Sequence, residues 1–103
     1  MSELSRKQQR FTSMVALLIT FINQRGYQVT FGDAYRDPRC PYGHPDSTHR
    51  SRLAIDLNLF KDGIYLSSGE EHEEFHDYWD DIGGAKRIEG DLNHYSLMHN
   101  GVR

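Results

Sequence analysis

This sequence has a single cysteine and only a small excess of acidic over basic residues. Cys40 is the only cysteine among 103 residues, which excludes an intrachain disulfide and any zinc finger built on several thiolates. A lone thiol also fits a protein made in a reducing compartment. The formal net charge is −3, so the chain lacks the basic excess typical of nucleic-acid-binding proteins. We therefore expect no nucleic-acid partner.

Long hydrophobic runs are absent too. The apolar stretch 14–22 follows basic residues, as in a secretory signal, but no small-residue cleavage site comes after it. It is also shorter than the roughly 20 apolar residues that span a bilayer. We expect synthesis in the cytoplasm, no signal peptide and no membrane insertion.

The composition is typical of a folded protein. Hydrophobic residues make up 37% of the chain and aromatic residues 12%, which argues against a disordered chain. The length allows one domain with a modest core and is too short for two. We expect a single, monomeric domain over residues 1–103.

Residues 4–24 carry apolar side chains at spacings of three and four, the pattern of a helix with one buried face. The expected buried residues are Phe11, Met14, Val15, Leu18 and Ile22, with Leu17 and Phe21 widening the stripe. Gly26 is a natural C-terminal stop. Basic residues cluster in the first turns instead of along the polar face, so core packing is favoured over a membrane-active helix.

The rest of the chain predicts a small antiparallel sheet. Alternating β-formers at 27–31 and 53–60 indicate strands, and the second strand places Asp56 on the face opposite its leucine and isoleucine side chains. A turn at 61–63 continues the second strand into a hairpin, and 93–98 predicts a last short strand.

A second helix is expected between the hairpin and the last strand. Ser67 or Ser68 can cap it, glutamates in its first turns suit the positive end of the helix dipole, and it should run to about Ile82. Its small apolar side includes Trp79, which we expect to anchor the core. The fold class is therefore α+β: a small antiparallel sheet packed with an N-terminal helix and a second helix.

Side chains that bind zinc occur at His49, Asp56 and His94. Three protein ligands with a fourth position open for water is the arrangement of a catalytic zinc. Asp91, three residues before His94, is well placed to take a proton from that water. Arg36, in a proline-rich stretch that predicts an irregular loop, is suited to stabilise the negative oxygen that develops on an attacked carbonyl.

The spacing of His49 and Asp56 imposes a bend. Seven fully extended residues would separate their Cα atoms by about 23 Å, yet both side chains must come within about 2.0–2.2 Å of one zinc ion. The chain must therefore turn back, so 49–52 should bend and only Leu53 onward should be strand. Ser47 can fix the bend by bonding nearby backbone.

The motifs that carry this chemistry resemble those of a known enzyme family. They are Ser47-x-His49 followed by Asp56 with Ala54 two residues before it, an upstream Tyr35-Arg36-Asp37-Pro38, and Asp91-x-x-His94-Tyr95. This set is similar to the zinc D-alanyl-D-alanine carboxypeptidase and L-alanyl-D-glutamate endopeptidase family, which includes many phage endolysins and shares the metal site of the hedgehog signalling domain. The resemblance covers nearly the whole chain.

The resemblance implies a hedgehog-like or D-Ala-D-Ala peptidase-like fold with one catalytic Zn²⁺ ion. The implied zinc ligands are His49, Asp56 and His94, the implied general base is Asp91, and the implied substrate-binding residues are Tyr35, Arg36 and Ser47. The expected function is hydrolysis of peptide bonds in the stem peptides or cross-bridges of bacterial peptidoglycan. As in phage lysis, the enzyme would act on the cell wall after release from the host cytoplasm.

Two features differ from that family. It usually has Gly three residues after the first His, where this chain has Arg52, and a non-Gly residue there must avoid positive φ or bear strain. The segment between Gly84 and Asp91 is short and lacks the Trp-Gly-Gly often found there, which predicts a reduced substrate groove. A non-catalytic, zinc-stabilised binding module is therefore the alternative function.

A second metal motif competes with the first. Residues 72–76 match H-E-x-x-H, in which His72 and His76 would bind zinc and Glu73 would be the base. The segment is strongly acidic, and both histidines are expected beside its apolar stripe. We interpret it as a solvated helix with two surface histidines, and the zincin as the less favoured alternative.

Cys40-x-x-x-His44 lacks a second cysteine for a structural zinc site.

Overall fold

A long N-terminal helix covers the sheet. The computed structural model describes residues 2–32 and 50–103. Helix α1 (Glu3–Gln24) begins after Ser2, whose hydroxyl accepts a hydrogen bond from the Ser5 N–H (3.1 Å). The five residues expected to be buried are buried, but Leu17 is 52% exposed and its predicted place in the stripe is wrong. No helix in the described part of the chain is long and apolar enough to cross a membrane.

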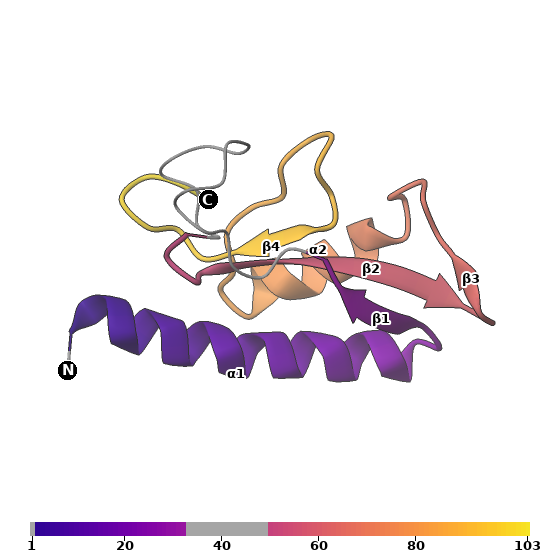
Figure 1. Cartoon of the computed structure of the whole chain (residues 1–103), viewed down its shortest axis with the longest axis horizontal. Helices are drawn as coiled ribbons and strands as arrows, with labels where there is room; N and C mark the ends of the chain where they lie inside the picture. Colours follow the sequence, from indigo (N-terminus) through magenta and orange to yellow (C-terminus); the bar gives the residue numbers. More distant parts are fainter. Residues whose placement is uncertain (1, 33–49) are drawn as a thin grey trace.

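Strand β2 (Ala54–Lys61) is the strand on which the sheet is built (Figure 1). β1 (Gln28–Phe31) pairs with one edge of it. The other edge pairs with two short strands in succession, β3 (Ile64–Tyr65) near the C-terminal end of β2 and β4 (His94–Ser96) near its N-terminal end. All the pairings are antiparallel, so the predicted strands and hairpin are confirmed: β2 is shifted by one residue at the same length, and β1 and β4 are shorter than predicted.

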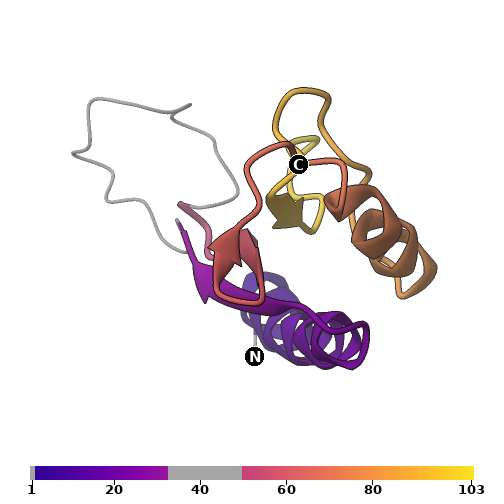
Figure 2. The ribbon, with the colours of Figure 1, turned by 90° about the vertical axis from the view of Figure 1, so that its right-hand side faces the viewer.

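Both helices pack on the same face of this sheet (Figure 2). α2 (His72–Asp81) lies beside α1, and aromatic pairs join the two helices: Phe11 and Trp79 meet edge to face, and Phe21 stacks on Tyr78 with 4.3 Å between ring centroids. The leucine and isoleucine side chains of β2 are buried in this core, and Asp56 alternates onto the opposite face as predicted. The protein is therefore a small α+β protein with two helices and an antiparallel sheet.

Helix α2 begins later than the sequence predicts. Its N-cap is Glu71, which makes no side-chain cap hydrogen bond, while the Ser68 hydroxyl donates to the Glu71 carboxylate (3.1 Å). Gly69 lies between them at φ +83, a conformation that a helix cannot continue through. The predicted serine cap is therefore wrong. Trp79 is fully buried, as expected of a core anchor.

Gly84 is required by the packing of Trp79, because a methyl group added at Gly84 would overlap the indole ring. We predict that Gly84→Ala lowers the free energy of unfolding by about 2–3 kcal/mol, since a buried ring must shift to admit the methyl group. Gly63→Ala is the matched control: its φ of +78 also disfavours alanine, but its Cβ would meet nothing within 4 Å, so it should cost about 1 kcal/mol. Urea unfolding measures both, and equal losses would contradict the packing role of Gly84.

Candidate metal centre

Asp56 and His94 meet because β2 and β4 pair in a register that sets them directly opposite each other. The Asp56 carbonyl is turned the other way and accepts a hydrogen bond from the Gly32 N–H (2.7 Å) at the end of β1. The Asp56 and His94 pair is therefore a non-hydrogen-bonded position of the β2–β4 ladder, where opposing side chains come closest. Asp56 Oδ1 and His94 Nδ1 are 3.3 Å apart.

This distance fits two ligands of one zinc ion. With bonds of about 2.0–2.1 Å, two tetrahedral zinc ligands lie roughly 3.3–3.4 Å apart, whereas hydrogen bonds between nitrogen and oxygen cluster near 2.9 Å. The side chains of Asp56 and His94 are 19% and 7% exposed, so both donor groups lie largely out of bulk water. A carboxylate and an imidazole are also the chemistry that zinc selects. The pair therefore fits the metal that the sequence implies.

Asp91 is placed by the turn that leads into β4. The His94 N–H donates to the Asp91 carbonyl (3.1 Å), and the Asp91 N–H donates to the Ile88 carbonyl (3.0 Å). These bonds fix the backbone of Asp91 three residues from a candidate ligand while its side chain stays exposed. The chain thereby carries a solvent-accessible carboxylate on the turn that leads to His94.

The third candidate ligand, His49, lies outside the described residues, as do Tyr35, Arg36 and Ser47. Cys40 and His44 also fall in 33–49. Within 2–32 and 50–103, no group of three or more His, Cys, Asp and Glu side chains is arranged to hold a metal ion. Of the predicted site residues, the structure brings Asp56 and His94 together and places Asp91 on the turn that leads to His94.

The bend expected before β2 is present in the described residues. Residues 50–52 form a turn and the strand starts at Ala54. Arg52 has φ +59, the left-handed conformation that Gly adopts without strain. Arg52 therefore does not avoid positive φ; it takes the conformation that Gly would favour at this position.

Helix α2 holds the β4 segment through ring side chains at three successive positions on one face. His76 Nε2 donates to the Leu92 carbonyl (2.6 Å), so its hydrogen is on Nε2. His72 Nδ1 is 2.7 Å from the Tyr95 hydroxyl oxygen, and the Trp79 Nε1–H donates to the Ser96 carbonyl (2.9 Å). His76 also stacks on Tyr95, with ring centroids 4.2 Å apart.

The predicted surface position of His72 and His76 is therefore wrong. His72 and His76 are only 3% and 0% exposed. Their burial is tolerated because each ring has a polar partner that offsets the loss of water. Glu73, the base of the H-E-x-x-H motif, is on the exposed side of the helix. The geometry does not favour the zincin, since Leu92 and Tyr95 occupy ring nitrogens and the glutamate faces away. These two histidines hold Tyr95 and Leu92, which flank His94 and the turn before it, in place. The sequence analysis did not predict this role.

Comparison with models of known protein families finds no match for this chain, and neither does comparison with curated proteins. The likeness to zinc peptidases therefore rests on the motifs themselves.

The backbone conformation of Arg52 leads to a stability prediction. A side chain at φ +59 costs about 1–2 kcal/mol relative to Gly, so Arg52→Gly should be more stable to unfolding than Arg52→Ala by about 1 kcal/mol. Both variants remove the guanidinium group, so the comparison isolates the backbone. Thermal unfolding of the pair measures the difference, and an alanine variant as stable as the glycine variant would exclude a strained bend.

His72 predicts a pH dependence of stability. Burial lowers the pKa of His72 from 6.5 to about 4, with the neighbouring His76 adding to the shift. The imidazole of His72 binds a proton near pH 6.5 in the unfolded chain but only near pH 4 in the folded chain. The contribution of the neutral, buried ring to stability is therefore complete above pH 6.5 and is lost as the pH falls toward 4.

His72→Asn places an amide near the Nδ1 position but cannot titrate. Its free energy of unfolding should fall less than that of the wild type between pH 7 and pH 5, by about 1–2 kcal/mol. Urea unfolding at the two pH values measures this. His76 is present in both proteins, so an identical fall would show that His72 does not carry the effect.

Proposed function

We propose that this protein is a zinc-dependent peptidase that hydrolyses peptide bonds of bacterial peptidoglycan, in the manner of a phage endolysin. The observation that supports it best is the pairing of Asp56 with His94 across β2 and β4, 3.3 Å apart. Asp91, whose side chain is exposed, lies three residues before His94 on the turn into β4. A ligand pair with a nearby base is the constellation that metal-assisted hydrolysis requires.

Zinc would be held by Asp56 and His94 with His49 as the third ligand. When bound it polarises the scissile carbonyl and makes a water acidic enough to attack at neutral pH. Asp91 accepts the proton of the attacking water and returns it to the leaving amine. Arg36 offsets the charge that develops on the carbonyl oxygen, and Tyr35 and Ser47 help to position the stem peptide.

The substrate class follows from the resemblance of the motifs and comprises D-Ala-D-Ala or L-Ala-D-Glu bonds in stem peptides or cross-bridges. The protein would be a monomer made in the host cytoplasm that reaches the cell wall after release. The alternative of a non-catalytic zinc-stabilised module was motivated by Arg52. Because Arg52 adopts the backbone conformation of Gly, this substitution is not a reason to expect loss of turnover.

Asp91→Asn separates catalysis from metal binding. The variant should lose about 10²–10⁴-fold in the rate of peptidoglycan cleavage, because the amide cannot accept the proton, and should retain zinc. His94→Ala should lose both activity and zinc, since it removes a ligand. The measurements are release of soluble peptides from purified sacculi and metal analysis of the dialysed protein.

Asp81→Asn, which makes the same change at an exposed residue at the end of α2, is the control and should behave as the wild type. Full activity of Asp91→Asn would exclude Asp91 as the base. A wild type that binds zinc but never cleaves sacculi would favour the non-catalytic module. Zinc binding that survived His94→Ala but not His72→Ala with His76→Ala would favour the zincin.

A further inference from the structure

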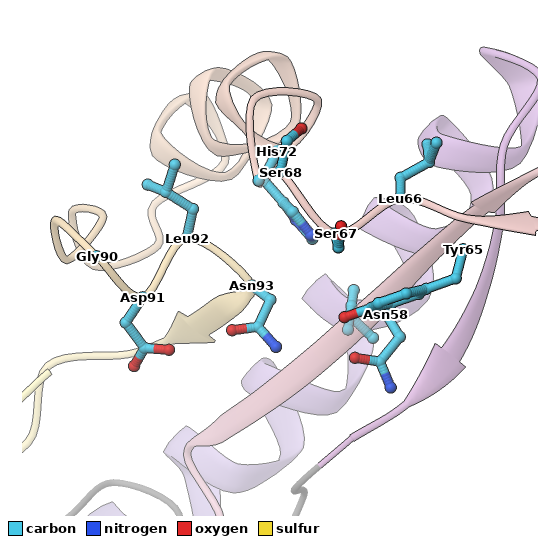
Figure 3. Close-up of a pocket in the computed structure, with 12 residues that line it drawn as sticks. Asn58, Tyr65, Leu66, Ser67, Ser68, His72, Gly90, Asp91, Leu92 and Asn93 are labelled. Carbon is cyan, nitrogen blue, oxygen red and sulfur yellow. The ribbon is translucent and has the colours of Figure 1, made fainter.

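A pocket opens where the edge of β2 passes from one partner strand to the other. β3 pairs with Phe60 and Lys61, and β4 pairs with residues 54–56. Two single hydrogen bonds bound the interval between them: the Leu57 N–H donates to the Asn93 carbonyl, and the Leu66 N–H donates to the Leu59 carbonyl, each at 2.9 Å. The pocket at this interval has a volume of about 270 Å³ (Figure 3).

The pocket is of a size to take one residue. Ligand sites for drug-sized molecules occupy about 300–1,000 Å³, and this volume lies just below that range. Asn93 and Tyr65 reach into it from opposite sides, from the β4 and β3 segments respectively (Figure 3). Tyr65 is 54% exposed and packs beside Phe60, so it offers an aromatic surface at the rim where a ligand can be partly covered.

The lining of the pocket is polar. Its polar side chains are Asn58, Tyr65, Ser67, Ser68, His72, Asp91 and Asn93. Asp91 is the only carboxylate among them, and neither lysine nor arginine lines the pocket within the described residues. Burial lowers the pKa of His72 to about 4, so its ring is uncharged at neutral pH. Asp91 therefore disfavours a ligand carboxylate at the pocket wall and can accept a hydrogen bond from a group that donates N–H bonds.

The turn that leads into β4 links the pocket to the candidate metal centre. Asp91, the proposed base, is part of its wall, and the Asp91 carbonyl is bonded to the backbone of His94. A side chain lodged in the pocket therefore belongs to a residue near the bond on which Asp91 acts.

We propose that this pocket is a specificity subsite for a stem-peptide residue next to the scissile bond, and that it accepts a side group ending in a carboxamide in preference to a carboxylate. The inference rests on the proposed peptidase function and adds the selectivity of that site. Carboxamide and carboxylate differ little in size, so discrimination between them is electrostatic: the amide donates to the acceptors of the wall, and the carboxylate is repelled by Asp91.

The test uses two synthetic stem pentapeptides that differ only in whether the glutamate residue carries a free carboxylate or a carboxamide. The wild type should cleave the carboxamide peptide with a kcat/KM about tenfold higher. Ser67→Lys places an ammonium group in the wall at an exposed residue and should abolish or reverse the preference. Ser13→Lys, which adds the same charge at an exposed position of α1, should leave it unchanged.

Calorimetric binding of both peptides to the same proteins separates this proposal from the peptidase proposal. Cleavage of both peptides at equal rates, with Ser67→Lys unchanged, would overturn the subsite and leave the peptidase standing. If no peptide or sacculus is cleaved, the peptidase proposal fails. The pocket is then judged by binding: tighter binding of the carboxamide peptide that Ser67→Lys removes would support it, and equal or absent binding would overturn it.

Discussion

The pairing of β4 with β2 is the contact on which the rest of the candidate site depends. It sets Asp56 opposite His94, and it brings the turn that carries Asp91 to the edge of the sheet. The pairing covers only three residues of each strand, too few to be stable alone. Helix α2 stabilises the pairing because His72, His76 and Trp79 form hydrogen bonds to the β4 segment. Their buried polar atoms would be costly to leave without partners. The helix therefore supports the strand that carries His94.

Local patterns in the sequence predicted the parts of the fold that depend on local physics. The helical period of α1 and the alternation of β2 each follow from burial of one face, and both were recovered nearly residue by residue. The bend before β2 was predicted from the reach of two zinc ligands, and the turn at 50–52 confirms it for the described residues. The hedgehog-like assignment of the fold and the peptidase activity stay predictions.

The features that the sequence did not predict depend on partners far along the chain. His72 and His76 lie in an acidic segment that looks solvated, and only the Tyr95 hydroxyl and the Leu92 carbonyl make their burial favourable. The pocket exists because β3 and β4 leave an interval on one edge of β2, and no local pattern encodes that register. The start of α2 was misplaced because Gly69 delays it beyond the expected serine cap.

The sharing of one β2 edge by β3 and β4 also orders the assembly of the protein. β3 follows β2 after a two-residue turn, whereas β4 returns only after α2, and contacts distant in sequence form more slowly than local ones. The hairpin that carries Asp56 can therefore form before His94 reaches it. In an incompletely folded chain Asp56 would lack His94 across the ladder, so the pairing of these two side chains marks completion of the fold.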